Sequence, residues 1–344
     1  MAEKEKRDEE AVGVLWKNRG VRKKDKAERH RGRAACAASV LFAAMLLTAC
    51  AGKNAAAGQD TSNGRQASPG QDGGTALKGP DAVTGQQDAD WLAVRMKQDR
   101  RTKHDLRTEP ENMEKAEQID LNTFENGRVI LAEGGDIRLS GSLEGQVIVD
   151  AEEDELVHLY LEGVEITSPN GPAIQIREAA KTIVTLVSDT ENVLSDSPDY
   201  TGYEEMPACF YSVCDLTING DGALRVFGYH EDGIRGKDRI KVLDGALSVQ
   251  AKGDGIRGND GIYMQNASVD IESEKNGLRT ANQGANDRGV IEINGGAISV
   301  IAGQNGVSAA SDLYLYGGRC SVNAVEEKLR AEGDAYIADG VQGL

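Results

Sequence analysis

A short motif that carries an acidic and a basic residue recurs through the C-terminal part of the chain. It begins as Asp232-Gly233-Ile234-Arg235 and returns as Asp254-Gly255-Ile256-Arg257, Asn276-Gly277-Leu278-Arg279, Asn305-Gly306-Val307-Ser308 and Glu327-Lys328-Leu329-Arg330. The successive spacings are 22, 22, 29 and 22 residues. A fixed period stacks equivalent positions of a repeat on one another, so we expect a row of carboxylates and a row of guanidinium groups.

The basic row is a candidate ligand-binding surface. Its members are Arg235, Arg257 and Arg279, with Arg330 two turns further on. Guanidinium groups about 4.8 Å apart would repel by about 1 kcal/mol in a water-like medium and by about 3 kcal/mol at an effective dielectric of 20. The row therefore needs an anionic partner, because guanidinium planes bind carboxylates in pairs of hydrogen bonds. Either the carboxylates of a uronic acid chain meet this need, or neighbouring acids do, such as Glu231, Asp238 and Asp260.

The acidic row is a candidate metal site. Calcium takes six to eight oxygen ligands, and two aspartates one turn apart repel unless a cation or hydrogen bonds compensate. The candidate ligands are Asp232, Asp254, Asp238 and Asp260. The alternative is a corner ladder in which each side chain bonds the backbone of the next turn, which is the role we expect for Asn276 and Asn305.

Other possible chemistry is sparse. A polar insertion at residues 282–288 follows Arg279 and would be either one wall of a groove or a tolerated bulge. Both tryptophans lie before residue 119, so any sugar recognition would rely on charge and hydrogen bonds more than on stacking. His230 beside the acidic row is interpreted as incidental, and no Ser-His-Asp, Cys-His or zinc-ligand spacing stands out.

The segments between the motifs alternate apolar and polar residues, which is typical of strands. The 22-residue offset carries Ile240 to Ile262, and Leu247 to Val269 and, further on, to Cys320; Val249 begins a column that we expect to end at Leu344. Stacked turns of this kind bury one continuous core. The sequence therefore predicts an all-β fold, a right-handed parallel β-helix over residues 119–344.

The N-terminal region predicts export. A basic stretch leads into a short apolar run that ends in Leu47-Thr48-Ala49-Cys50, which resembles a lipoprotein signal peptide with its lipobox. Residues 1–49 would be removed and Cys50 acylated, placing the protein outside the cytoplasm on the outer face of the cell membrane or on the outer membrane. Residues 50–118 are polar and lack periodicity, so we expect a disordered spacer.

Composition excludes several functions. The formal net charge is −17, which disfavours nucleic acids and anionic membrane surfaces as partners and leaves cations and polysaccharides open. Beyond the lipobox only Cys209, Cys214 and Cys320 remain, which is not a disulfide framework. We expect a monomer that touches the membrane through its lipid alone.

The ordered motifs over residues 127–330 resemble one bacterial family. They are Val164-Glu165-Ile166-Thr167-Ser168-Pro169-Asn170-Gly171-Pro172-Ala173-Ile174, Asn192-Val193-Leu194-Ser195-Asp196, Asp215-Leu216-Thr217-Ile218-Asn219-Gly220 and the Asp-Gly-Ile-Arg repeats. The resemblance is to carbohydrate-binding-domain-containing lipoproteins, distantly like polysaccharide lyases. It implies a calcium-containing β-helix that binds cellulose or acidic polysaccharides. Cys214 stands where the family has Asp, and Cys209 where it has a small apolar residue.

Three functions follow as expectations. The first is non-catalytic, calcium-assisted polysaccharide binding at the cell surface. The second is a calcium-dependent polysaccharide lyase, in which Arg235, Arg257 or Lys237 abstracts the proton at C5 of a uronic acid. The third is a structural or adhesion protein of the envelope without glycan specificity.

Overall fold

A computed structural model describes residues 12–13, 100–112, 114–125, 127–284 and 287–344. The expected signal peptide, the lipidation site Cys50 and the spacer up to residue 99 therefore lie outside the described residues, apart from a two-residue strand β1 (Val12–Gly13) that pairs with β3. No helix in the described part of the chain is long and apolar enough to cross a membrane.

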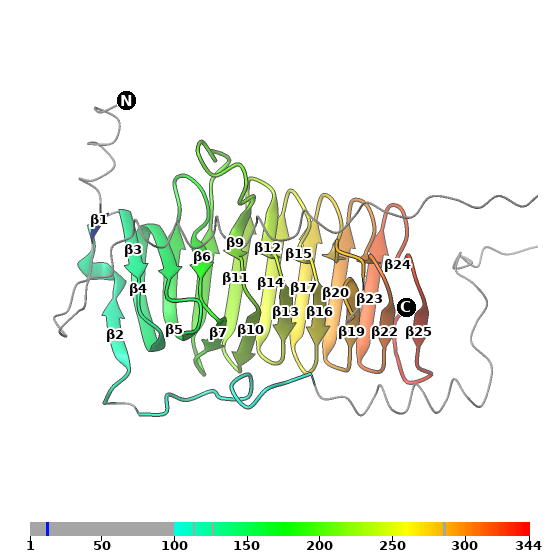
Figure 1. Cartoon of the computed structure of the whole chain (residues 1–344). Helices are drawn as coiled ribbons and strands as arrows, with labels where there is room; N and C mark the ends of the chain where they lie inside the picture. Colours follow the sequence, from blue (N-terminus) through cyan, green and yellow to red (C-terminus); the bar gives the residue numbers. More distant parts are fainter. Residues whose placement is uncertain (1–11, 14–99, 113, 126, 285–286) are drawn as a thin grey trace, which may run out of the picture. The chain divides into compact units, whose positions relative to one another are not determined.

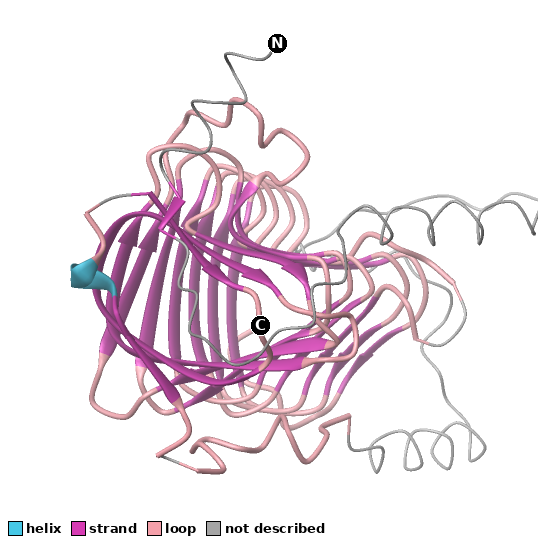
Figure 2. Ribbon diagram, turned by 60° about the vertical axis from the view of Figure 1, so that its left-hand side comes forward, coloured by secondary structure: helices cyan, strands magenta, loops and turns pink. Residues whose placement is uncertain are grey.

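The described body is a parallel β-helix in which each regular turn contributes three strands (Figures 1 and 2). The first strand of each turn belongs to a sheet that we call the arginine face, because it carries the arginine row. Its strands are β3 (Gly127–Leu131), β6 (Ile174–Glu178), β9 (Ala208–Ser212), β12 (Asp232–Gly236), β15 (Ile256–Gly258), β18 (Leu278–Arg279), β21 (Val307–Ala309) and β24 (Leu329–Ala331).

The second strand of each turn belongs to the strap face, named after residues 100–112, which lie on it and which we call the strap. Its strands are β2 (Glu117–Asp120), β7 (Lys181–Leu186), β10 (Leu216–Gly220), β13 (Arg239–Val242), β16 (Gly261–Met264), β19 (Val290–Ile293), β22 (Leu313–Leu315) and β25 (Ala335–Ile337).

The remaining strands complete the helix. The third face consists of β8 (Glu191–Ser195), β11 (Ala223–Gly228), β14 (Ala246–Ala251), β17 (Ser268–Ser273), β20 (Ala297–Ala302) and β23 (Arg319–Ala324). Two long strands bend from face to face, β4 (Gly135–Asp150) and β5 (Leu156–Thr167). A 3-10 turn, η1 (Leu121–Thr123), follows β2.

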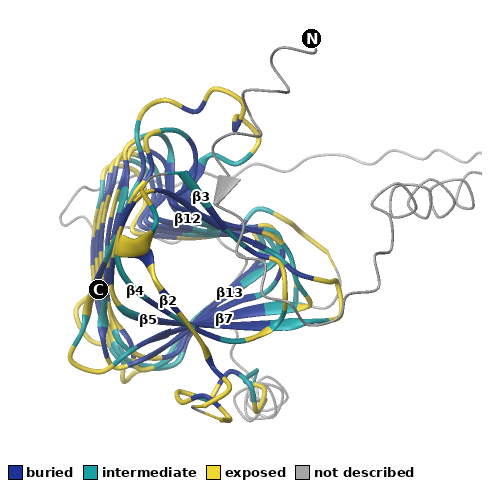
Figure 3. Cartoon of the chain, turned by 90° about the vertical axis from the view of Figure 1, so that its left-hand side faces the viewer, coloured by how far each residue is buried: buried dark blue, intermediate teal, exposed yellow. Residues whose placement is uncertain are grey.

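The core has the predicted columns. Ile234 pairs in register with Ile256, which pairs with Leu278, and all three side chains are fully buried. Cys320 follows Ile298 in the column that begins at Leu247, as predicted. The end-on view shows these buried segments facing a common interior (Figure 3). The parallel β-helix predicted from the 22-residue repeat is confirmed.

Close packing explains the glycine of the repeat. A Cβ atom on Gly233, Gly255, Gly277 or Gly306 would lie 2.1–2.3 Å from a methyl group of Val249, Ile271, Val300 or Val322 on the third face. That separation is impossible for real atoms, so the two faces approach as closely as they do only because the repeat has no side chain there.

The last turn departs from the predicted pattern. Lys328 stands where the four earlier motifs have glycine. By the spacing of those turns, the third-face residue opposite Lys328 would be Leu344. Leu344 is 41% exposed, and the terminal segment adds one bridge, Arg319–Gln342. The prediction that Leu344 ends the Val249 column is wrong, because no strand completes the third face there. A lysine is tolerated where no packed methyl group opposes it.

The strap differs from the spacer expected up to residue 118. Residues 100–112 are described and contact the body, with Asp105 completely buried, and β2 begins at Glu117. Charged side chains of the strap form ion pairs and hydrogen bonds with the strap face. The strap is therefore docked although its composition is typical of disorder.

Candidate functional site

The arginine row forms as predicted. Arg235 pairs in register with Arg257, which pairs with Arg279. Ser308 interrupts the row, and Arg330 continues it one turn later. The side chains of Arg235 and Arg257 are about one-fifth exposed, whereas Arg279 is 39% exposed. The row therefore becomes more accessible toward the C-terminal turns.

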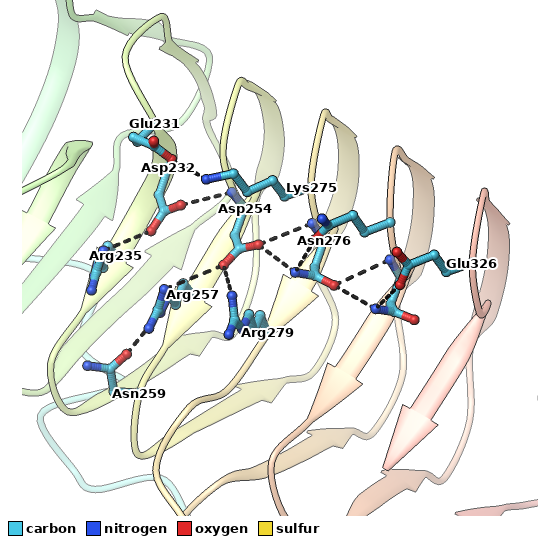
Figure 4. Close-up of polar contacts among 12 residues, drawn as sticks. Glu231, Asp232, Arg235, Asp254, Arg257, Asn259, Lys275, Asn276, Arg279 and Glu326 are labelled. Atoms are coloured by element: carbon cyan, nitrogen blue, oxygen red, sulfur yellow. Dashed lines mark hydrogen bonds and ion pairs between the residues drawn. The ribbon is translucent and has the colours of Figure 1, made fainter. Parts of the chain in front are cut away.

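The acids that neutralise the row are Asp232 and Asp254 (Figure 4). Arg235 lies 3.4 Å from an oxygen of Asp232, while Arg257 at 3.8 Å and Arg279 at 3.4 Å share one oxygen of Asp254. The first two motifs thus supply their own acid three residues before the arginine. At the third motif this position holds Asn276, so Arg279 shares the acid of the previous turn.

The structure assigns other partners to two of the acids expected to neutralise the row. Glu231 pairs with Lys275 at 2.6 Å, and Asp260 pairs with Arg288 at 3.3 Å. Asp238 lies at the far end of β12, where burial and the neighbouring Asp215 and Asp260 raise its pKa. The expectation that these acids face the arginines is therefore corrected: the neutralising acids come from within the motif itself.

The acidic row is also a corner ladder. An oxygen of Asp232 accepts the N–H of Asp254 at 2.8 Å, and Asp254 in turn accepts the N–H of Asn276 at 3.1 Å and its side-chain amide at 2.7 Å. Asn276 accepts the N–H and the amide of Asn305 in the same way, at 3.3 and 3.0 Å. The ladder role expected for the two asparagines is confirmed, and it extends to both aspartates.

Burial perturbs the charges of the ladder. Burial, followed by the nearby Asp254 charge, raises the pKa of Asp232 to about 6. Burial and the neighbouring guanidinium groups of Arg235 and Arg279 lower the pKa of Arg257. The row therefore holds charges that are only partly compensated by their partners.

The aspartate pair does not fit calcium as it stands. Each carboxylate of Asp232 and Asp254 already accepts a backbone N–H with one oxygen and faces guanidinium with the other. A divalent cation there would lie against like charges. Within the described residues, no group of three or more His, Cys, Asp or Glu side chains is arranged to hold a metal ion. Calcium therefore stays a prediction.

A cleft of about 410 Å³ opens beside the exposed end of the arginine row. Polar side chains from the turns of β18, β21 and β24 line it, among them Arg279, Gln283, Gln304, Ser308, Glu326 and Arg330. Gln283 comes from the insertion, so at least this residue of the insertion contributes to the lining of the cleft. Arg235 and Arg257 do not line this cleft.

Arg330 occupies the far side of the cleft. Its guanidinium group donates to Glu332 at 2.5 and 3.1 Å, and its side chain is 46% exposed. An exposed pair of this kind contributes little to stability, about 0 to 1 kcal/mol. The group is therefore free to exchange its partner for a ligand at small cost.

The remaining sequence candidates have structural partners. His230 stacks on Tyr200 with ring centroids 4.0 Å apart and lies 3.1 Å from the carbonyl of Pro198, so it packs against a loop. Cys209, Cys214 and Cys320 are buried free thiols, and burial raises the pKa of each. Neither group forms a catalytic arrangement in the part of the chain that is described.

Sequence reasoning missed the polar strap face. Lys181 and Lys241 meet the carboxylate of Asp105, a residue placed in the spacer. Nearby, His158 is fully buried between the hydroxyls of Thr185 at 2.6 Å and Tyr160 at 3.1 Å, and burial lowers its pKa to about 3. Polar residues at outward strand positions such as Lys181, Thr185 and Lys241 were the available signal.

Comparisons with known proteins agree with this architecture. A curated protein of Acetivibrio thermocellus, described as a carbohydrate-binding domain-containing protein, is 30% identical over 141 residues, which are 40% of this chain and 49% of that protein. The chain thus spans about half the length of this relative. A solved structure described as the polysaccharide lyase-like protein from C. thermocellum, in a gadolinium derivative, matches with a TM-score of 0.59 and 26% identity, over 66% of this chain and 90% of the other.

The family profile described as carbohydrate-binding domain-containing protein matches residues 125–343, nearly all of the β-helix. The resemblance drawn from the motifs is confirmed. The chain belongs to the carbohydrate-binding domain-containing protein family.

Proposed function

We propose that this protein is a non-catalytic polysaccharide-binding protein, held at the cell surface by a lipid on Cys50, and that the cleft at Arg279 and Arg330 binds acidic polysaccharide. The observation that carries the proposal is the charge balance of the arginine row. Arg235 and Arg257 each have an aspartate three residues before them, whereas Arg279 has the neutral Asn276 and shares Asp254 with Arg257.

The shared carboxylate leaves Arg279 without an acid of its own, whereas Arg330 pairs with Glu332 and Glu326 also lines the cleft. Arg279 is also the most exposed of the three consecutive arginines, and it points to the cleft wall. A sugar carboxylate would accept from its remaining N–H groups, with Arg330 as a second cation across the cleft. Amide and hydroxyl groups of Gln283, Gln304 and Ser308 are suited to sugar hydroxyls.

The binding test is retention on polygalacturonate, with cellulose as the neutral comparison. We expect Arg279→Gln to lower the affinity for polygalacturonate about tenfold, which corresponds to the loss of about 1.4 kcal/mol. The matched control is Arg225→Gln, because Arg225 is an exposed arginine on the third face, paired with Glu191. Equal retention of wild type and Arg279→Gln would exclude the cleft as the binding site.

Calcium assistance and lyase activity have separate tests. If calcium assists binding, EDTA lowers retention, and unchanged retention removes calcium from the proposal. Growth of ultraviolet absorbance from unsaturated products would replace the binding function with a lyase. Failure to bind any glycan of a broad panel would instead favour a structural role in the envelope.

Lipid anchoring is tested at the thiol. We expect Cys50→Ala to appear in the medium or soluble extract, whereas the wild type fractionates with membranes, because acyl chains hold the protein to the bilayer. A wild-type protein without attached lipid would contradict this part of the proposal.

A further inference from the structure

The strap crosses many turns of the helix on the strap face. It is the cyan segment that runs beside the strands in Figure 1. Arg107 pairs with Asp136 on β4 at 2.7 Å, Asp105 meets β7, β10 and β13, and Arg100 pairs with Glu292 on β19 at 2.6 Å. The strap therefore lies along the axis, as a linear ligand on a β-helix would.

Asp105 is the centre of this contact. Its carboxylate is completely buried and accepts from Lys241 at 2.9 Å, from the Thr217 hydroxyl at 2.6 Å, from the N–H of Thr102 at 2.7 Å and from Lys181. Burial acts to raise the pKa of Asp105, but the hydrogen bonds outweigh it and the pKa is lowered. The pocket is thus built for a carboxylate.

The rest of the strap is held by polar contacts. The side-chain amide of Asn219 donates to the carbonyls of Asp105 at 2.7 Å and Arg107 at 3.0 Å, and Lys241 donates to the carbonyl of Arg100. Leu106, the apolar residue beside Asp105, is 53% exposed. Because little apolar area is buried at that residue, a competing anion can replace the contact without a large hydrophobic cost.

Without the strap, the two lysines of the strap face would need another anion to neutralise them. Lys181 and Lys241 come from strands separated only by β10, and their charges converge on one carboxylate. Removing that carboxylate leaves two ammonium groups without their shared partner, which is unfavourable in a partly buried site. The same release would leave Asp136 and Glu292 without Arg107 and Arg100, so only the part of the open face at Lys181 and Lys241 is suited to an anion.

Clefts flank the strap on both sides. One of about 360 Å³ is lined by Asp105 itself and by polar groups that include Tyr160, Thr185, Asn219, Gln265 and Asn266. The other, of about 410 Å³, is lined by Lys241 and Arg239 and also by the acids Asp215, Asp287 and Glu292. Open space thus lies on either side of the buried carboxylate, in two separate clefts.

We propose that the strap occupies a second polysaccharide site, in which Asp105 holds the position of a ligand carboxylate between Lys181 and Lys241, and that an acidic polysaccharide displaces it. The flanking cleft has a mixed lining that includes Asp221 and Asp244, and its hydroxyl and amide groups are the ones that could bind sugar hydroxyls. This site is separate from the cleft at Arg279, so it goes beyond the function proposed above.

The test measures a galacturonate oligomer binding to full-length protein that carries Arg279→Gln, so that the arginine face contributes little. Two variants release the strap: Asp105→Asn removes its charge, and Asp105→Lys sets a third ammonium group against the other two. Leu106→Lys is the matched control, because it adds a cation at the exposed neighbour and keeps Asp105. Hydrogen exchange of residues 102–108 reports the state of the strap.

We expect Asp105→Lys to bind the oligomer about tenfold more tightly than Leu106→Lys, and a further Lys241→Gln to abolish the gain. In the protein with Asp105 intact, saturating oligomer should speed exchange of the strap. Equal affinities of the released and control variants, or a gain that survives Lys241→Gln, would overturn the proposal. Tighter binding of polyglutamate than of the oligomer would also overturn it, because the groove would then be a peptide site. The cleft at Arg279 is tested separately, by the loss of binding that Arg279→Gln causes in the otherwise wild-type protein. Failure of the proposal for one site therefore does not decide the proposal for the other.

Discussion

The arginine face and the strap face both set carboxylates against basic side chains, but their carboxylates come from different places in the sequence. On the arginine face, the motif itself supplies an aspartate three residues before Arg235 and Arg257. On the strap face, Asp105 is 76 residues from Lys181 and 136 residues from Lys241. The first arrangement repeats with the turns, whereas the second occurs once.

This difference sets what each face can do. A repeated row offers similar groups to several units of a polymer, and Asn276 before Arg279 marks the first position at which an arginine lacks its own aspartate. The contacts of the strap instead cover a polar surface with a segment that is distant in the sequence, and we propose that this segment can be exchanged. The arginine face is therefore a permanent surface of the protein, whereas the strap face is covered by residues of the same chain.

The largest expected effect is on the strap face. Asp105→Ala leaves Lys181 and Lys241 without their shared carboxylate, so we expect a loss of about 3 kcal/mol in the free energy of docking the strap. Hydrogen exchange of residues 102–108 measures this loss directly. Lys103→Ala, an exposed strap residue, is the control and should change nothing. Protection of the strap that persists in Asp105→Ala would mean that its backbone contacts suffice.

The next effect tests the packing that aligns the arginine face. Gly255→Ala places a Cβ atom 2.3 Å from Ile271, and we expect the free energy of unfolding to fall by about 1 to 3 kcal/mol. Lys328→Ala at the equivalent position of the last motif should be neutral, because no packed core residue opposes it. Chemical denaturation of both variants checks this. Equal stability of the two variants would contradict the explanation of the repeated glycine.

An effect of similar size and opposite sign is expected on the arginine face. The pKa of Asp232 is raised to about 6 in the folded chain, so the folded state holds its proton more tightly than the unfolded state. Stability from this group is therefore greatest below about pH 4 and is lost as the pH rises to about 6. We expect Asp232→Asn to raise the free energy of unfolding at about pH 8 by about 1 to 3 kcal/mol and to flatten the pH dependence. Denaturation across this pH range in both proteins is the measurement, and destabilisation by Asp232→Asn would show that its ion pair with Arg235 outweighs the cost of burial.

The smallest effect concerns Arg330. Its exposed pair with Glu332 contributes less than about 1 kcal/mol, so Arg330→Gln should leave the melting temperature nearly unchanged. Retention on polygalacturonate should nevertheless fall, because the cleft loses its second cation. Thermal melting and retention are measured on the same sample. A large fall in stability with unchanged retention would make Arg330 structural and not ligand-binding.

Periodic features could be predicted from the sequence, and the structure shows why. Equivalent residues such as Ile234 and Ile256 lie over one another because each turn has the same length, so rows follow from spacing alone. The neutralising role of Asp232 was not predicted, because strand alternation does not determine where a long side chain ends, and Glu231, Asp238 and Asp260 were expected instead. The ladder at Asn276 and Asn305 was predicted, whereas the cleft depends on side-chain positions that the spacing does not give.

Features that occur once could not be predicted. Asp105 lies in a segment whose composition is typical of disorder. No motif or spacing near it in the sequence predicts a contact with Lys241. Only the folded sheet brings the outward-facing Lys181, Thr217 and Lys241 into a pocket of the right size for one carboxylate. The strap was therefore assigned to the spacer.

Hydrogen exchange of the intact protein with and without saturating polygalacturonate tests the proposed polysaccharide site most directly. We predict new protection in residues 276–283, 304–310 and 326–332, which border the cleft at Arg279 and Arg330, and none on the third face around Arg225. Protection that spares all three cleft segments would contradict the assignment of the arginine face as the polysaccharide-binding surface.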